Sequence, residues 1–458
     1  IYPATGEIIG FGAAGDAEDV DRAVATAVEA QKSWAKMRAR DRGKLLYKCA
    51  EALEEHVEEL GRLIALETGK ALRTESRVEA SILADAFYFH AGLGSELKGE
   101  TVPHHPDMLT ITVREPIGVV GAIIPWNVPL LLMALKIAPA LLAGNAVIVK
   151  SAEEAPLTVL RVCQIMNAVL PAGVFQMLSG FGPECGAPLV AHKKVGKVTF
   201  TGSVETGKIV YKTAADKLIP VTLELGGKSP MIVFDDAKID KAVDGAVIGM
   251  RFTRQGQSCT AASRIFVHDK VYDEFVAKLR AKVDAMVMGD PLDEKTDIGT
   301  IISPEQFSKV QGYIEHGRKE PGAVPIECSA MPSDPKFKDG LFVRPVVTEI
   351  GHDSRLAREE IFGPVTCIFR WTDREQVLAA ANDTEFGLAA TVWTNDLHAA
   401  LNFTEKLEAG FVQVNQNLVV QPGLSYGGVK NSGLGKEATL EAMLEHFTHK
   451  KTIIFNKT

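Results

Sequence analysis

The fold is decided by residues 197–224, which read KVTFTGSVETGKIVYKTAADKLIPVTLE. A short β-rich run at 197–200 leads through a Gly-Ser turn into a helix-like run at 204–215, and a second β-rich run follows at 221–224. Strands that alternate with helices in this way form parallel βαβ units, because two parallel strands need a long crossover connection. The stretch therefore predicts an α/β fold with a doubly wound parallel sheet and helices on both faces.

The same alternation extends along the chain in both directions. We expect further strands at 108–113, 118–124, 146–150 and 175–178, and helices at 130–142 and 155–169. Residues 16–97 read as three helices, the first with Asp16 as its N-cap, the second at 40–67 and the third at 72–97. A second alternating series runs from about 231 to 414, so we expect a second sheet of the same kind.

The most apolar stretch, residues 128–149, is long enough to span a membrane. Its two prolines, Pro129 and Pro139, together with Gly144 and the central Lys136, favour a buried helix followed by a buried strand. We therefore expect no membrane segment here. Residues 1–15 also lack a basic start followed by an apolar core, so no signal peptide is predicted within them.

Composition narrows the classes of protein further. With 46% hydrophobic and 24% charged residues among 458, disordered, collagen-like and disulfide-scaffold proteins are excluded. The 50 Lys and Arg against 58 Asp and Glu leave a net charge of −8, whereas a non-specific nucleic-acid or membrane binder would show a basic excess. Six cysteines without a C-x-x-C pair predict reduced thiols, no zinc site and a cytoplasmic location. His446 and His449 lack a third ligand, so no metal site is predicted.

Cys259 stands apart from the other cysteines by its neighbours. It lies in the polar segment Gln255–Thr260, whereas Cys49, Cys163 and Cys367 have apolar neighbours. A thiolate is a strong nucleophile, and a polar loop permits ionisation. Cys259 is thus a candidate nucleophile, with an ordinary surface thiol as the alternative.

Two polar side chains end predicted strands, where the sites of α/β proteins form. Glu224 precedes a glycine turn and is a candidate general base, although it could instead pair with Lys228 or cap a helix. Asn127 follows Ile124, Pro125 and Trp126, and its amide is a neutral donor suited to an oxyanion. The alternative for Asn127 is a cap on the helix that starts near Pro129.

The ordinary dinucleotide fingerprint G-x-G-x-x-G does not follow the first strand. Instead, Gly202 and Ser203 lie between a strand and a helix, where a helix N-terminus offers donors to a phosphate. Upstream, Lys150 and Glu153 follow another strand, and Glu153 could accept hydrogen bonds from both hydroxyls of a ribose. Because a ribose 2′-phosphate would meet that carboxylate unfavourably, NAD is favoured over NADP.

Taken together, these segments resemble the aldehyde dehydrogenase superfamily, in its order and spacing. The resemblance covers essentially the whole chain and rests on six motifs: Pro125–Asn127, Lys150-x-x-Glu153, Phe200–Ser203, Glu224–Gly227, Gly256–Cys259 and Glu360–Pro364. It implies a two-domain α/β fold with a small β element for oligomerisation. The implied limits are 1–97 and 117–226 for an NAD-binding domain, 227–431 for a catalytic domain, and 98–116 with 432–458 for a bridging element.

The resemblance also implies the chemistry. Cys259 would attack the aldehyde, Asn127 would hold the oxyanion, and hydride would pass to NAD to leave a thioester. Glu224 would activate the water that releases the acid. Lys136 and Glu437 match a pair that relays protons from the base in the family, and a structural ion pair is the alternative for them.

The remaining implied contacts concern the cofactor and the substrate. The cofactor set consists of Ile124, Pro125, Trp126, Lys150, Glu153, Gly182, Gly202, Ser203, Leu225, Glu360 and Phe362. The expected substrate tunnel consists of Leu131, Leu135, Ser258, Thr260, Asn417, Val420 and Tyr426. Several of these replace aromatic residues that are frequent in the family, so we expect a broad or bulky aldehyde substrate. Arg251 and Arg254 could meet an anionic substrate tail, or be structural, or face another subunit.

The reaction expected is aldehyde, NAD and water to carboxylic acid and NADH. A CoA-acylating semialdehyde dehydrogenase is the first alternative, although such relatives usually lack a base at the position of Glu224. A structural relative without catalysis is the second, and the intact Cys259, Glu224 and Asn127 disfavour it. The resemblance also implies a homodimer or homotetramer, and the strand-like tail 452–455 could pair with an exposed edge of another subunit.

Overall fold

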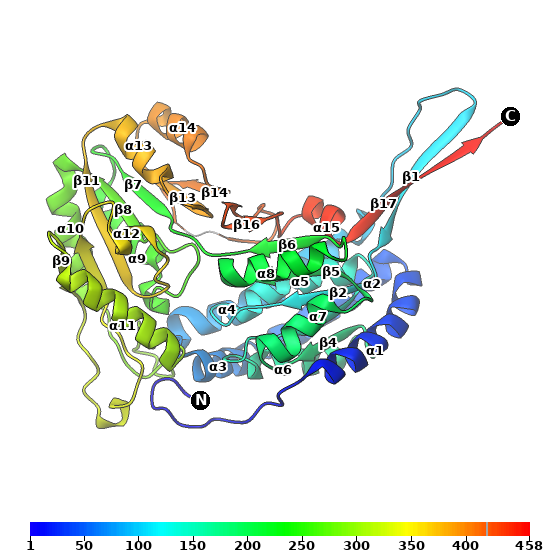
Figure 1. The fold of residues 1–458 in the computed structure, drawn as a ribbon, viewed down its shortest axis with the longest axis horizontal. Coiled ribbons are helices and arrows are strands. Elements are labelled where there is room, and N and C mark those ends of the chain that lie inside the picture. The colour runs from blue at the N-terminus through cyan, green and yellow to red at the C-terminus, as the bar shows by residue number, and fades with distance from the viewer. Residues whose placement is uncertain (418–419) are drawn as a thin grey trace.

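The computed structural model describes residues 1–417 and 420–458. Figure 1 shows two layered α/β units side by side, and a two-stranded ribbon that projects away from them and ends at the C-terminus. Two large, mainly parallel sheets of six and seven strands form the centres of the two units. The doubly wound α/β architecture predicted from residues 197–224 is confirmed.

The first sheet has the strand order β16-β6-β5-β2-β3-β4, and it is parallel except for β16 at its edge. Three of its strands have the predicted bounds, and the central β5 is longer than predicted. The strands are β2 (Val119–Ile123), β3 (Ala146–Lys150), β4 (Phe175–Leu178), β5 (Val195–Thr201), β6 (Val221–Glu224) and β16 (Gly433–Leu434).

Helices cover both faces of this sheet because successive side chains of its strands point to opposite faces. Val120 and Ala122 pack into one buried cluster, and Val119 packs into another. The first cluster includes α2 (Ala39–Glu55), α3 (Val57–Thr68), α4 (Arg77–Gly92), α5 (Pro129–Leu142) and α6 (Leu157–Asn167). The second includes α1 (Ala17–Lys36), α7 (Ala187–Ala191) and α8 (Val204–Ala215).

The N-terminal helices differ in part from the prediction. Asp16 caps α1 as predicted, with a reciprocal bond to Asp19. The single helix expected at 40–67 is broken into α2 and α3 at His56, whose φ of −106° and ψ of 12° leave the helical region. The helix expected at 72–97 starts with a π-helical turn, Leu72–Ser76, and only its middle part is α-helical. Neither break was predictable from a helix-breaking residue, because positions 56 and 76 hold neither Gly nor Pro.

The second sheet has the order β14-β13-β7-β8-β11-β10-β9, parallel except for β9. Its strands are β7 (Pro230–Val233), β8 (Arg264–His268), β9 (Val324–Glu327), β10 (Val346–Glu349), β11 (Val365–Trp371), β13 (Ala389–Trp393) and β14 (Phe411–Val414). One face packs against α9 (Ile239–Met250) and α10 (Asp269–Asp284). The other packs against α11 (Pro304–Lys319), α12 (Arg355–Arg358), α13 (Arg374–Asn382) and α14 (Leu397–Lys406).

The projecting ribbon consists of β1 (Met108–Pro116) and β17 (Thr448–Asn456), which pair antiparallel with Ile111 opposite Ile453. The strand-like tail therefore pairs within its own chain. A smaller antiparallel pair joins β12 (Phe386–Gly387) to β15 (Val429–Lys430), and α15 (Leu440–His446) precedes the tail. The domain limits stay a prediction. One strand of the predicted bridging element 432–458, β16, lies at the edge of the first sheet, where it pairs with β6.

The apolar stretch 128–149 forms the buried helix α5 and the buried strand β3, as expected. Its central Lys136 is fully buried and paired with Glu437. Within the described ranges, no helix combines the length and the apolar character that crossing a membrane requires.

Candidate active site

Cys259 lies in a loop between the two units, after the short helix Phe252–Arg254 and before β8. The loop is shaped by residues with left-handed φ values, among them Gln255 at 56° and Gly256 at 64°. A side chain at Gly256 would come within 2.1 Å of the Gly363 carbonyl oxygen, so this position requires glycine. Cys259 as a residue is partly exposed, and the five other cysteines are buried.

The surroundings of Cys259 keep its thiol protonated at rest. Its Sγ lies 3.7 Å from the hydroxyl of Tyr426. Burial raises the pKa of the thiol to about 11, and the charges of Glu360 and Glu224 raise it further against the opposing effects of Tyr426 and Arg254. A thiol with this pKa needs a base to become a nucleophile near neutral pH.

Glu224 ends β6 with a buried carboxyl group. Among the described residues, neither carboxyl oxygen has a hydrogen-bond partner of normal geometry, and the same holds for Lys228 Nζ. The predicted alternative of a Glu224–Lys228 pair is therefore wrong. A Cβ on Gly427 would lie 2.6 Å from Glu224 Oε1, so glycine at this position leaves room for the carboxyl group.

The pKa of Glu224 lies well above its usual value. Burial is the largest cause, and the negative charge of Glu437 adds to it. Lys136 and Lys436 lower the pKa, but they do not outweigh burial. A carboxyl group with a raised pKa can take up a proton from a thiol or a water near neutral pH.

Asn127 lies in the turn between β2 and α5. Its Nδ2 donates to the Gln257 carbonyl oxygen at 3.1 Å, which fixes the amide beside the Cys259 loop. Val128, not Asn127, is the N-cap of α5, and no side chain makes the cap bond, so the capping alternative for Asn127 is wrong. The second N–H of this buried amide can serve an oxyanion.

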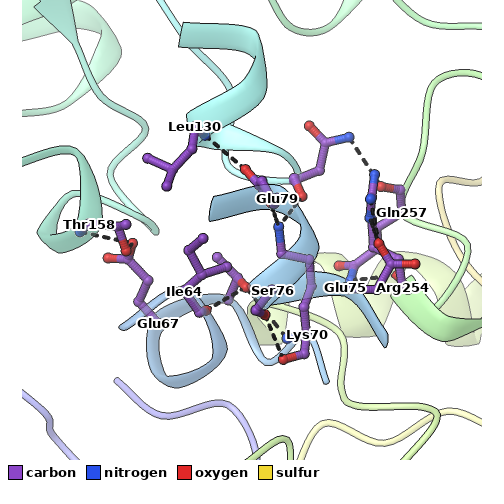
Figure 2. A network of polar contacts seen from close by, with 12 residues as sticks. Ile64, Glu67, Lys70, Glu75, Ser76, Glu79, Leu130, Thr158, Arg254 and Gln257 are labelled. Atoms are coloured by element: carbon purple, nitrogen blue, oxygen red, sulfur yellow. Dashed lines mark hydrogen bonds and ion pairs between the residues drawn. The ribbon is translucent and has the colours of Figure 1, made fainter. Parts of the chain in front are cut away.

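A buried ion pair lies behind the Asn127 turn. Lys70 pairs with Glu79, and Lys70 Nζ also donates to the Asn127 carbonyl oxygen at 2.8 Å. Glu79 Oε1 accepts the backbone N–H of Leu130 at 2.8 Å (Figure 2). The pair therefore holds both ends of the turn that carries Asn127. The sequence gives no local signal for this pair, because its members lie on segments remote from residue 127.

A cavity of about 290 Å³ opens on one side of Cys259. Six of the seven expected tunnel residues line it: Leu131, Leu135, Ser258, Thr260, Val420 and Tyr426. Asn417 is a correction to the prediction: it is not among the lining residues, and its Nδ2 donates to the Gly245 carbonyl oxygen of α9 at 2.9 Å. The wall also contains residues not expected from the sequence: Thr74, Glu75, Val78, Glu79, Ile82, Val128 and Leu132.

A second cavity, of about 200 Å³, opens on the other side of Cys259. Seven of the expected cofactor residues line it: Pro125, Trp126, Gly202, Ser203, Leu225, Glu360 and Phe362. The rings of Trp126 and Phe362 meet edge to face with centroids 5.3 Å apart. Thr201, Gly226, Gln306 and Lys309 line it as well and were not predicted.

Glu360 is held in this second cavity by the glycine turn after β6. Its Oε1 accepts the Gly227 N–H at 2.9 Å, and a Cβ on Gly226 would lie 2.3 Å from its carboxylate. Burial raises the pKa of Glu360 to about 7, against the lowering effects of the Gly227 N–H and of Lys309. Among residues 1–417 and 420–458, its other oxygen makes no hydrogen bond, so it can accept one from a sugar hydroxyl.

A third, largely apolar cavity of about 420 Å³ lies along β2, β5 and α8, and it is lined by Lys150 and Gly182. Glu153 pairs with Lys150 at 2.9 Å at its rim and is not a lining residue, and Ile124 is buried and lines none of the three cavities. Ser203 caps α8, which leaves other N-terminal N–H groups of the helix free. These features fit the parts of a dinucleotide. The apolar cleft suits the adenine, the helix N-terminus suits the pyrophosphate, and a carboxyl group suits a ribose.

Comparison with known proteins identifies the family of the chain. Residues 1–453 match the model of the aldehyde dehydrogenase family. The chain belongs to the aldehyde dehydrogenase family. One relative is aldehyde dehydrogenase family 2 member B4 of Arabidopsis thaliana, 42% identical over 98% of this chain and 84% of the relative. Another is betaine aldehyde dehydrogenase of Agrobacterium fabrum, 42% identical over 99% of this chain and 91% of the relative.

Solved aldehyde dehydrogenase structures share the fold along the whole chain. A putative aldehyde dehydrogenase of Burkholderia cenocepacia superposes with a TM-score of 0.96 at 38% identity, covering 100% of this chain and 93% of that one. Betaine aldehyde dehydrogenase of Staphylococcus aureus, solved with NAD+, gives 0.96 at 37% identity and covers 100% and 91%. The resemblance stated from the six motifs is confirmed.

Proposed function

We propose that the chain oxidises an aldehyde to a carboxylic acid with NAD+ and that Cys259 is the nucleophile. One observation carries the proposal: Cys259 lines both the tunnel cavity and the cavity that contains Glu360 and Phe362. A substrate carbon bound to its sulfur would therefore lie between the substrate entry and the cofactor cleft. NAD+ supplies the hydride acceptor when it is bound in that cleft.

In the first half of the reaction, the Cys259 sulfur adds to the aldehyde carbon. Glu224 accepts the thiol proton, directly or through a water, and the carbonyl π electrons move onto oxygen. The Asn127 amide donates to this oxyanion and stabilises it. Loss of hydride from the carbon then restores the C=O bond and leaves a thioester on Cys259.

Glu224 first gives up the thiol proton to solvent, and this is the proton released by the overall reaction. In the second half, the ionised Glu224 takes a proton from water, and the oxygen of that water adds to the thioester carbon. The C–S bond breaks, the acid leaves, and the sulfur regains a proton. The presence of Glu224 favours water over CoA as the acyl acceptor, because CoA needs no water-activating base. Production of free acid without CoA would distinguish the two.

Replacement of Cys259 tests the proposal. Cys259→Ala should abolish aldehyde-dependent NADH formation, measured at 340 nm, while NAD+ binding by calorimetry is retained. Cys163→Ala, which changes a buried cysteine on α6, is the matched control and should keep most of the activity. Equal activity in Cys259→Ala and the wild type would refute the nucleophile, and a wild type inert towards every aldehyde would refute the function.

We also infer a homodimer or homotetramer in the cytoplasm. The ribbon exposes Leu109, Ile454 and Phe455, with 43%, 57% and 49% of their surfaces accessible. Residues 100–102 pair with the outer edge of β1, whereas β17 has no second strand partner among the described residues. Apolar side chains on an open edge favour pairing with another subunit. Six unpaired thiols suit a reducing compartment. Light scattering after gel filtration, on the full chain and on Ile454→Lys, tests the oligomer.

A further inference from the structure

The charged residues of the tunnel wall do not balance one another. The wall contains two acidic residues, Glu75 and Glu79, and two basic residues, Arg251 and Arg254. Glu79 is already paired with Lys70, which lies behind the wall. The charge facing the tunnel is therefore decided by Glu75 and the two arginines.

Both carboxyl oxygens of Glu75 accept hydrogen bonds, one from a threonine and the other from one of these arginines. Arg254 donates to Glu75 Oε2 from Nε at 3.0 Å and from Nη2, and the Thr253 hydroxyl donates to Oε1. Figure 2 shows Arg254 and Glu75 in direct contact. Burial alone would raise the pKa of Glu75, but the charges of Arg254 and Arg251 lower it to about 2. The Glu75–Arg254 pair is thus a permanently ionised and internally neutral unit.

Arg251 is the cation that remains. Its Nη1 lies 3.9 Å from Glu75 Oε1, beyond hydrogen-bond distance, and its guanidinium makes no hydrogen bond within residues 1–417 and 420–458. Its side chain is 27% exposed. The backbone is fixed, because Arg251 is the left-handed C-cap of α9 with φ of 54° and its carbonyl oxygen accepts the Gly256 N–H at 2.8 Å. The backbone therefore places this arginine on the tunnel wall, where its one ionic partner among the described residues is the more distant Glu75, already hydrogen-bonded to Arg254.

The rest of the wall suits an anionic chain better than a cationic one. Arg251 and Tyr426 line the same cavity, and the Tyr426 hydroxyl lies 3.7 Å from the Cys259 sulfur. The aliphatic side chains of Leu131, Leu135 and Val420 pack in one cluster with Tyr426 and Cys259 on this wall. Tyr426 is the sole aromatic residue among the described residues of the wall, whereas a quaternary ammonium group is held by several aromatic faces.

We propose that the tunnel selects aldehydes that carry a carboxylate or similar anion a few carbons from the aldehyde group, with Arg251 as the counter-charge. This inference rests on the proposed function and names its substrate class. The guanidinium would bind the anion with two parallel N–H donors, while the aldehyde carbon lies at Cys259. The preference would be opposite to the cationic substrate that the names of several relatives specify.

The test compares three aldehydes of similar size and different charge: 4-oxobutanoate, 4-methylpentanal and betaine aldehyde. In the wild type, kcat/KM should be highest for 4-oxobutanoate and lowest for betaine aldehyde. Arg251→Gln should lower kcat/KM for 4-oxobutanoate by about 10- to 100-fold, the effect of losing a charge-assisted contact, and change that for 4-methylpentanal by less than about threefold. Arg251→Lys should retain part of the preference. Arg62→Gln, on the exposed face of α3, is the control and should change neither value.

Two further measurements keep the inference separate from the proposed function. Raising the salt concentration should lower kcat/KM for the anionic substrate and leave the neutral one unchanged, which needs no variant. Succinate, which has no aldehyde group, should bind to the wild type by calorimetry and more weakly to Arg251→Gln. Equal loss for all three aldehydes in Arg251→Gln, or a wild type without charge preference, would overturn the inference while leaving the oxidation of aldehydes intact.

Discussion

Lys136 Nζ lies 2.7 Å from Glu437 Oε1, in an ion pair that is buried on both sides. Glu437 Oε1 also accepts the Thr199 hydroxyl at 3.2 Å. Glu437 raises the pKa of Glu224 and Lys136 lowers it, so the pair adjusts the protonation of the candidate base, beyond the larger effect of burial, even without passing a proton. This electrostatic role needs neither residue to change its charge.

Lys136→Met should shift the acid limb of the kcat profile to higher pH. Removal of this cation takes away its lowering effect on Glu224 and leaves Glu437 with the more distant Lys197 as its counter-charge, so the pKa of Glu224 rises and a higher pH is needed to ionise it. The variant should also lose about 3–5 kcal/mol of unfolding free energy, because a buried charge is left without its partner. Thr199→Val removes the neutral hydrogen bond to Glu437 and should shift the limb much less. An unshifted limb in a folded Lys136→Met would contradict the electrostatic role.

Glu224→Gln should separate the two halves of the reaction. The amide can take a proton from neither the Cys259 thiol nor water. Thioester formation should therefore be slower than in the wild type, but its hydrolysis, which loses the water-activating base, should be slower still, so the thioester should accumulate on Cys259. Stopped-flow measurement should show a burst of NADH near one per site and then a steady state reduced by at least about 100-fold, in line with the loss of a general base. A steady state equal to that of the wild type would remove Glu224 from the water step.

The sequence predicted the parts of the site that are local in the chain. The strand ends carrying Asn127 and Glu224 and the loop of Cys259 follow from alternation and glycine turns. Asn127 and Cys259 line the same two cavities, and Glu224, which lines neither, is near enough to raise the pKa of the Cys259 thiol. Contacts between segments that are distant in the chain could not be predicted from the sequence. Lys70 reaches the Asn127 carbonyl across 57 positions of sequence, and the Asn417 amide is taken by α9 instead of the tunnel. Such pairings depend on how layers pack, for which a single sequence holds no periodic signal.

Glu360→Gln should change the pH dependence of both stability and NAD+ binding. The unfolded carboxyl group ionises near its ordinary pKa, whereas the folded one stays protonated up to about 7. Unfolding free energy should therefore fall as pH rises from about 4.5 to 7 in the cofactor-free wild type, and fall less in Glu360→Gln. NAD+ affinity should increase through pH 7 in the wild type, where the carboxylate accepts ribose hydroxyls, and remain flat in the variant. Melting curves and calorimetry across pH 5–8 check both signs.

Glu153→Gln should weaken the preference for NAD over NADP. Glu153 is paired with Lys150 at 2.9 Å on the rim of the apolar cleft, where its charge would oppose a ribose 2′-phosphate. Neutralising it removes this repulsion and frees the Lys150 ammonium. The ratio of kcat/KM for NAD to that for NADP should fall by about tenfold, the equivalent of about 1.4 kcal/mol. Glu184→Gln, on the turn Gly182–Gly186 near the same cleft, is the control of equal charge change.

The Lys70–Glu79 pair should be separable into a stability part and a positioning part. Lys70→Met alone leaves Glu79 buried and unpaired, so it should cost about 3–5 kcal/mol of unfolding free energy. The double variant Lys70→Met/Glu79→Leu has no buried charge and should recover most of that loss. It still lacks the bonds to the Asn127 carbonyl and the Leu130 N–H, so its kcat should stay at least about tenfold low while KM for NAD+ changes little.

A matched control for this pair is Glu67→Gln, which weakens a buried carboxyl cap on the N-terminus of α6 and touches neither Asn127 nor Leu130. It should lower the melting temperature without lowering kcat. A double variant that regained full kcat together with its stability would show that the pair acts on folding alone. If kcat instead stays low in the refolded double variant, the Asn127 turn depends on Lys70 and Glu79 for its position, because no destabilising charge is then left to explain the loss.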